Sequence, residues 1–238
     1  MNDRVSLSSL LSATSDQFQE HGRIVAVYLA LMIPLGALSQ YFDGQGADNG
    51  DLFNFGLMID QALIDQGALA VVVVLGVFVI GLLAHYWLYA AMTKRTDSPG
   101  FGRFWPYLGI YILGSLAIGF GLVLIIVPGV ILAIRWTPLL AVVIDRDDRA
   151  MDSFGDSWDM TRGHGWSLFG AVLILLIALI AVGAVVGGMT VVLGEGSIAS
   201  SVLAAAVEAA GSVVYAAFAV GAYRLMRDDR EQLAEVFE

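Results

Sequence analysis

Six long runs of apolar residues, separated by short polar segments, dominate the pattern along the chain. A helix needs about 20 mostly apolar residues to cross the roughly 30 Å of hydrocarbon in a bilayer. Because backbone groups inside a bilayer must bond to one another, we expect each run to form a transmembrane helix. The pattern therefore predicts an all-α, polytopic membrane helix bundle with spans at residues 24–42, 67–92, 106–126, 128–144, 166–192 and 198–223.

The third and fourth predicted spans are separated only by Val127, Pro128 and Gly129. Proline cannot donate a hydrogen bond to a preceding helical turn, and glycine tolerates the backbone angles of a tight turn. We therefore expect a tight hairpin at this point. A single kinked helix over residues 106–144 is the alternative, but it would be about twice as long as the bilayer is thick.

Basic residues lie on one side of the predicted bundle. Cytoplasmic loops of membrane proteins carry an excess of Lys and Arg. Here the basic residues precede span one, lie between spans two and three and between spans four and five, and follow span six. The sequence therefore predicts a multi-pass protein of the cell's inner (cytoplasmic) membrane with both termini in the cytoplasm. The residues concerned are Arg4, Arg23, Lys94, Arg95, Arg103, Arg146, Arg149, Arg162, Arg224, Arg227 and Arg230.

The composition agrees with a chain that lipid solvates. Of its 238 residues, 58% are hydrophobic and only 14% charged, whereas soluble domains have about 25% charged residues. We expect residues 1–238 to form one integral membrane domain. The chain has no cysteine, and its net charge of −10 argues against nucleic acid as a partner. We predict neither a metal site nor a cofactor.

Three transitions from polar to apolar sequence resemble one another, at Gln19–Ala37, Phe101–Ala117 and Thr161–Leu179. Each has a glycine and a basic or aromatic residue before a span that returns through a second span. They are compatible with three repeats of a helical hairpin. Glycine and basic residues are also common at any cytoplasmic helix entry, so this similarity has two interpretations.

The segments before spans one and five, residues 1–22 and 147–162, have apolar residues at helical spacing. Both are compatible with amphipathic helices on the cytoplasmic leaflet, and equally with linkers whose apolar residues pack on neighbouring helices. Residues 51–66, on the outer side, show a similar stripe, which suits either an interfacial helix or an extension of span two. The stripe residues are Leu7, Leu10, Leu11, Thr14 and Phe18, then Phe154, Trp158 and Thr161, and Leu52, Phe55, Ile59 and Leu63.

Two charged residues fall inside predicted spans. Arg135 in span four and Glu208 in span six each face a cost of roughly 2.5–3.5 kcal/mol at the centre of a membrane helix. We expect them to pair, because opposite buried charges are less costly together than apart. Pro138 should kink span four and release a carbonyl near Ile134. This polar spot is either a clamp that fixes helix register or a ligand-binding site.

Gly183 and Gly187 in span five form a GxxxG pattern, which allows helices to approach closely. The alanine-rich span six is the expected partner within the chain, and dimerisation is the alternative.

Residues 119–166 resemble a known family. The similar features are Pro128-Gly129, Arg135 and the run Ser157-Trp158-x-x-Thr161-Arg162-Gly163-x-x-Trp166. They resemble the membrane domain that precedes the catalytic domain of some glycerophosphoryl diester phosphodiesterases, and that also occurs alone in bacterial inner-membrane proteins. The resemblance implies a six-helix domain of unsettled biochemical role, and it does not imply phosphodiesterase activity, which belongs to the separate catalytic domain. Gly155 and Asp156 replace the basic residues that the family tends to have, which weakens an anionic-lipid interpretation.

Two functions suit this pattern. The first is a non-enzymatic membrane protein that binds membrane lipids or other membrane proteins and supports envelope homeostasis. The second is a small-solute or ion transporter or channel, with Arg135, Glu208 and Pro138 as its mid-membrane site. No catalytic set of residues stands out, and the sequence does not indicate an oligomeric state.

Overall fold

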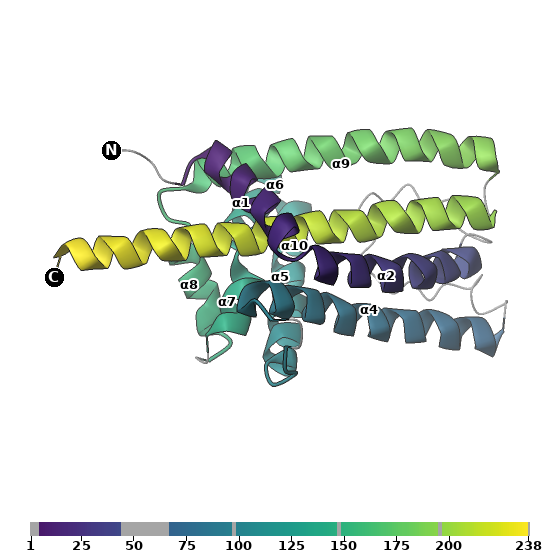
Figure 1. Cartoon of the computed structure of the whole chain (residues 1–238), viewed down its shortest axis with the longest axis horizontal. Helices are drawn as coiled ribbons and strands as arrows, with labels where there is room; N and C mark the ends of the chain where they lie inside the picture. Colours follow the sequence, from purple (N-terminus) through teal and green to yellow (C-terminus); the bar gives the residue numbers. More distant parts are fainter. Residues whose placement is uncertain (1–4, 44–66, 97–98, 147–148, 195–196, 238) are drawn as a thin grey trace. The chain divides into compact units, whose positions relative to one another are not determined.

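The computed structural model describes residues 5–43, 67–96, 99–146, 149–194 and 197–237, and is helical throughout with no strand among these residues. The predicted segment 51–66 lies outside the described residues. The helices are α1 (Leu7–Glu20), α2 (Gly22–Asp43), α4 (Ala68–Lys94), α5 (Phe104–Leu124), α6 (Ile126–Arg135), α7 (Leu139–Asp145), α8 (Asp152–Met160), α9 (Gly165–Leu193) and α10 (Ile198–Phe237) (Figure 1).

Six segments are long and apolar enough to cross a membrane, which confirms the predicted all-α fold of a multi-pass membrane protein. Five of them follow single helices, and the fourth comprises α6 and α7 together. Each predicted span overlaps one of them. They are Gly22–Gln40, Ala68–Lys94, Phe104–Leu124, Ile126–Asp145, Gly165–Leu193 and Ile198–Asp228.

The turn between the third and fourth spans lies earlier than predicted. Helix α5 ends at Leu124 and α6 begins at Ile126, with Ile125 in extended conformation between them. Pro128 is accommodated in the first turn of α6, where a backbone N–H has no helical partner to lose. The hairpin is therefore confirmed, but Pro128 and Gly129 follow the turn rather than form it.

Gly129 allows α5 and α6 to pack in direct backbone contact. A Cβ atom on Gly129 would lie 2.4 Å from the backbone nitrogen of Leu122, and one on Gly121 would lie 2.8 Å from the Cα of Gly129. No larger residue fits at this crossing without moving a helix. The glycine of the predicted turn thus serves helix packing.

The chain folds into two compact units, each assembled from segments that are distant in sequence. Unit 1 contains residues 1–24, 86–177 and 213–238, and unit 2 contains residues 25–85 and 178–212. Within unit 1 the fully buried side chains cluster near the end of α4, in α7 and in the middle of α10, at residues 216–226. Within unit 2 small residues bring α2 close to α10, since a Cβ on Gly36 would lie 3.1 Å from that of Ala205.

Both predicted amphipathic segments contain helices, and both pack on the protein. In α1 the buried residues Leu10, Thr14 and Gln17 lie on one face, and Gly221 of α10 contacts the backbone of Ala13. In α8 the buried residues are Ser153, Ser157 and Met160. Both segments therefore pack on neighbouring helices through one face, and the prediction that they lie on the cytoplasmic leaflet stays a prediction.

The GxxxG pattern of α9 does not make the predicted close contact. A Cβ on Gly183 or Gly187 would find nothing within 4 Å among the described residues. The nearest approach of α10 is further along, where a Cβ on Gly211 would lie 3.7 Å from Leu179. A GxxxG spacing indicates only that a helix surface is smooth, and the surrounding side chains decide whether it is used. The threefold repeat stays a prediction.

Candidate functional site

The fourth span is broken beside Arg135, as Pro138 predicts. Helix α6 ends at Arg135, and α7 begins at Leu139 with Pro138 as its N-cap. The Leu139 N–H donates to the carbonyl of Trp136 at 3.1 Å instead of to that of Arg135, which would accept it in a regular helix. The Ile134 carbonyl, which was expected to be released, accepts from Thr137 N at 3.3 Å.

The carbonyl that needs a new partner is that of Arg135, and α8 supplies it. Ser157 Oγ donates to this oxygen at 2.9 Å, and Thr161 Oγ1 lies 3.4 Å from it. Both hydroxyl residues are 0% exposed. The Thr161 hydroxyl has a single proton and lies closer, at 3.0 Å, to the carbonyls of Ser157 and Trp158, so Ser157 is the main donor. Because a carbonyl that has left its helix and lacks a donor is costly, Ser157 stabilises the break in the span.

The guanidinium of Arg135 also contacts α8. Its Nη1 donates to the carbonyl of Thr161 at 2.6 Å, and its Cζ lies 5.3 Å from the ring centroid of Trp158. Thr161 is the C-cap of α8, where a cation is favoured by the helix dipole. Arg135, Ser157, Trp158 and Thr161 thus form a single clamp between α6 and α8.

Arg135 and Glu208 each have another polar partner within their own unit, and the predicted ion pair between them stays a prediction. Arg135 belongs to unit 1 and bonds to α8, whereas Glu208 belongs to unit 2 and accepts from Gln40 Nε2 at 3.3 Å. The prediction expected a kink at Pro138, but it considered only the other predicted spans as sources of a partner for Arg135. The break at Pro138 and the return of α8 provide that partner instead.

The rest of the sequence motif lies around the start of α9. Gly163 has a φ of +86°, a left-handed conformation that favours glycine, and it ends the turn after α8. Arg162 is exposed and lies 3.7 Å from Asp159. Trp166 is 87% exposed, and Trp105 at the start of α5 is 76% exposed. Exposed tryptophans at the ends of membrane helices are typical of the membrane–water boundary.

A second polar cluster joins the ends of α1 and α4 to the interior of α10, and the sequence analysis missed it. Glu20 Oε2 accepts from Arg224 Nη1 at 2.7 Å, and Glu20 Oε1 lies 3.4 Å from Arg95 Nη2. The other terminal nitrogen of Arg224 donates to the Met92 carbonyl near the end of α4. The sequence marked both arginines as basic residues beside spans, but it gave no signal that a carboxylate from α1 would lie between them.

The pKa values of Glu20 and of the adjacent His21 are shifted. Burial tends to raise the pKa of Glu20, but the hydrogen bond and charge of Arg224, together with Arg95, outweigh it and hold that pKa below its usual value. Burial lowers the pKa of His21, whose Nδ1 lies 3.2 Å from the Gln17 carbonyl. His21 is thus neutral near pH 7 and donates this bond.

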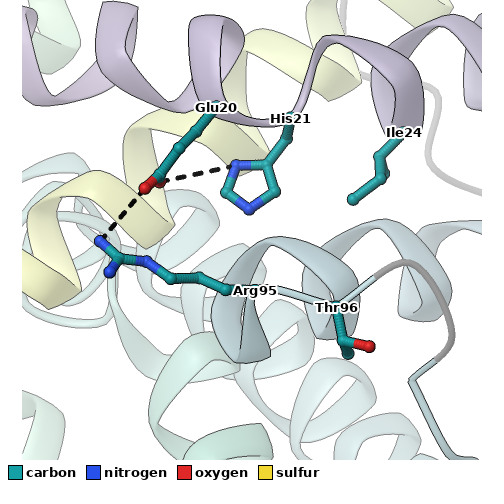
Figure 2. Close-up of a pocket in the computed structure, with 5 residues that line it drawn as sticks. All are labelled: Glu20, His21, Ile24, Arg95 and Thr96. Carbon is teal, nitrogen blue, oxygen red and sulfur yellow. Dashed lines mark ion pairs between the residues drawn. The ribbon is translucent and has the colours of Figure 1, made fainter.

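Two pockets border this cluster. The first, of about 240 Å³, is lined by Glu20, His21, Ile24, Arg95 and Thr96. Figure 2 shows Glu20 and His21, at the junction of α1 and α2, facing Arg95 at the end of α4. The second, of about 560 Å³, shares Glu20 and Arg95 with the first and is also lined by Ala13, Asp16, Gln17, Gln19, Gly221, Arg224, Leu225 and Asp228.

One lining side chain of the larger pocket lacks a hydrogen-bond partner. Gln17 is only 4% exposed, and its Oε1 has no donor within reach among the described residues. In contrast to Gln17, Arg95 has a side chain that is 64% exposed, and its backbone has a φ of +50°. Neither pocket is lined by Arg135 or Glu208. In the part of the chain that the structure describes, no three His, Cys, Asp or Glu side chains lie together as a metal site would require.

Comparison with known proteins gives one match. A family model described as a domain of unknown function, DUF7847, matches residues 53–225. No curated protein and no solved structure matches the chain. The resemblance to the phosphodiesterase membrane domain stays a prediction.

Proposed function

Since the chain belongs to the DUF7847 family, which has no assigned function, we propose its function from its own residues. It is a non-enzymatic protein of the inner (cytoplasmic) membrane that binds membrane lipid, supports envelope homeostasis, and has both termini in the cytoplasm. The polar cluster of Glu20, Arg95 and Arg224 then lies at the cytoplasmic surface of the membrane.

The observation that carries this proposal is the position of the pockets. The first span begins at Gly22, next to Glu20 and His21, and the second span ends at Lys94, next to Arg95. The pockets around Glu20 and Arg95 therefore lie beside the ends of two spans. This is the depth of lipid headgroups. The exposed Trp105 and Trp166, at the starts of two other spans of the same unit, support the same boundary.

The state of the charged groups favours binding over catalysis. Glu20 is held by two arginines, and its lowered pKa makes it a poor proton donor or acceptor near neutral pH. Neutral His21 bonds to its own helix through Nδ1. Fixed charges of this kind suit the recognition of a polar headgroup.

A transporter was the second hypothesis, and it depended on Arg135, Glu208 and Pro138 acting as one site. Arg135 and Pro138 belong to the α6–α8 clamp, where the guanidinium and the carbonyl of Arg135 both have partners. Glu208 is bonded to Gln40. Because these residues do not share one set of contacts, we favour lipid binding.

The test is the lipid content of the purified full chain. We expect native mass spectrometry from a mild detergent to show retained phospholipid, and Arg95→Gln to lower the retained amount severalfold. Arg162→Gln is the matched control, because Arg162 is also an exposed arginine with one acidic neighbour but lies outside both pockets. If the wild-type protein retains no more lipid than an unrelated six-span protein, the proposal is wrong.

A further inference from the structure

The larger pocket has a charge pattern that selects among headgroups. Its ionisable lining residues are the acids Asp16, Glu20 and Asp228 and the bases Arg95 and Arg224, so acids exceed bases by one (3 − 2). A phosphate without hydrogen-bond donors attached would leave the excess acid without a partner. A ligand that presents a phosphate to the arginines and hydrogen-bond donors to the acids would be matched at both ends.

Arg95 is the basic residue of the pocket that has unused hydrogen-bond donors. A guanidinium has five N–H donors, and the pair with Glu20 at 3.4 Å uses few of them. Arg224 is instead committed to Glu20 and to the Met92 carbonyl and is nearly buried. A phosphate oxygen therefore has Arg95 as its partner in this pocket.

Gln17 indicates the other end of the ligand. Gln17 lines the pocket, and its buried amide oxygen has no donor among the described residues, although nearly all buried polar atoms in proteins have a partner. The carboxylates of Asp16 and Asp228 lie in the same lining. All three groups accept hydrogen bonds, so the ligand atom that reaches them should carry N–H or O–H groups.

We propose that the pocket of Asp16, Gln17, Glu20, Arg95 and Asp228 binds a phosphodiester whose head carries hydrogen-bond donors, either an amine or hydroxyl groups. Arg95 holds the phosphate, and Gln17 with the two aspartates accepts from the donors. This inference rests on the proposed lipid binding and specifies its headgroup. The same chemistry occurs in membrane phospholipids and in their soluble, deacylated glycerophosphodiesters.

The test titrates the full chain in detergent with phosphatidylethanolamine, phosphatidylglycerol and phosphatidylcholine of identical acyl chains, with binding followed by native mass spectrometry. Phosphatidylcholine is the matched control, because it keeps the phosphodiester and has no donor on its head. We expect the first two lipids to bind about tenfold more tightly than the third. Equal binding of all three lipids overturns the inference and leaves the proposed lipid binding intact.

Two substitutions locate the site. Gln17→Leu should abolish the preference over phosphatidylcholine, and it removes an unpartnered buried amide, so folding should be maintained. Asp16→Asn, at an exposed position, should weaken the preference and tests the same point if Gln17→Leu does not fold. If both folded variants keep the full tenfold preference, the donors of the headgroup do not bind to these residues and the inference fails.

Soluble glycerophosphoethanolamine separates the two sources of the ligand. Competition with bound lipid supports the headgroup chemistry for a membrane ligand. If glycerophosphoethanolamine binds in a Gln17-dependent manner while no lipid is retained, the chemistry stands with a soluble ligand and the proposed lipid function falls. Failure of every phosphodiester to bind overturns both proposals.

Discussion

Substitution of Ser157 by alanine tests whether α8 supports the broken fourth span. Ser157 is 0% exposed and donates to the Arg135 carbonyl at 2.9 Å. Its loss leaves that carbonyl with Thr161 Oγ1, at 3.4 Å, as its remaining donor in α8. Loss of a buried hydrogen bond that leaves its acceptor poorly satisfied costs about 1–3 kcal/mol. We expect Ser157→Ala to cost about 1–2 kcal/mol, because Thr161 compensates in part.

The two hydroxyls should therefore be coupled. Thr161→Val alone should cost less than Ser157→Ala, since the shorter bond remains. The double variant should cost more than the sum of the two, by about 0.5–1 kcal/mol, because each hydroxyl can partly replace the other. Only a double-mutant cycle distinguishes this coupling from two independent losses.

The assay is reversible unfolding in mixed micelles, followed by tryptophan fluorescence. Ser153→Ala is the matched control, because Ser153 is buried in the same helix and has no bond to Arg135 among the described contacts. If Ser157→Ala and Ser153→Ala differ by less than about 0.5 kcal/mol, the hydroxyl does not stabilise the break and the argument is refuted.

Three further outcomes can be measured on the same protein. Gly129→Ala should destabilise the protein by about 1–3 kcal/mol in the same unfolding assay, because the new Cβ would lie 2.4 Å from the backbone of α5. Gly119→Ala is the control and should be neutral or stabilising, because the space around Gly119 is open. In thermal melts, stability should fall as the pH drops below 6.5, because the lowered pKa of His21 makes its protonation less favourable in the folded state than in the unfolded state. It should fall further below pH 4.5, because protonation of Glu20 removes a charge that the folded state stabilises. Glu20→Gln should remove only the second fall. Because the chain has no cysteine, an impermeant maleimide should label Ser197→Cys but not Thr96→Cys in intact cells, and the reverse pattern would contradict the proposed orientation.

The sequence was sufficient for the helices because hydrocarbon imposes a simple rule on the backbone. A run of about 20 apolar residues must be helical inside a bilayer whatever its neighbours are, so the six spans could be predicted without knowledge of packing. The end of α5 was misplaced for the same reason. Residues 125–127 are as apolar as the helices on either side, and hydropathy therefore cannot mark a turn among them.

The partners of the polar residues could not be predicted in this way. Arg135 and Glu208 were paired because each is costly alone in a membrane, but that cost specifies only that a partner exists. A backbone carbonyl at the end of α8 satisfies Arg135 as well as a carboxylate would, and Gln40 serves Glu208. Ser157 and Thr161 were noted as motif residues, yet their role depends on the break that Pro138 makes in another helix.

The ion pairs of unit 1 determine which of its charges remain for a ligand. Exposed pairs contribute little stability, whereas a nearly buried arginine that loses its carboxylate is left as an uncompensated charge. Arg224 is only 8% exposed and depends on Glu20, so Glu20 must stay with Arg224 to hold the end of α1 against α10. A ligand that took over Glu20 would have to replace this contact. The groups that can bind a headgroup without disturbing this contact therefore include Arg95, which has unused donors, and Gln17, which has an unused acceptor, together with Asp16 and Asp228 of the same pocket.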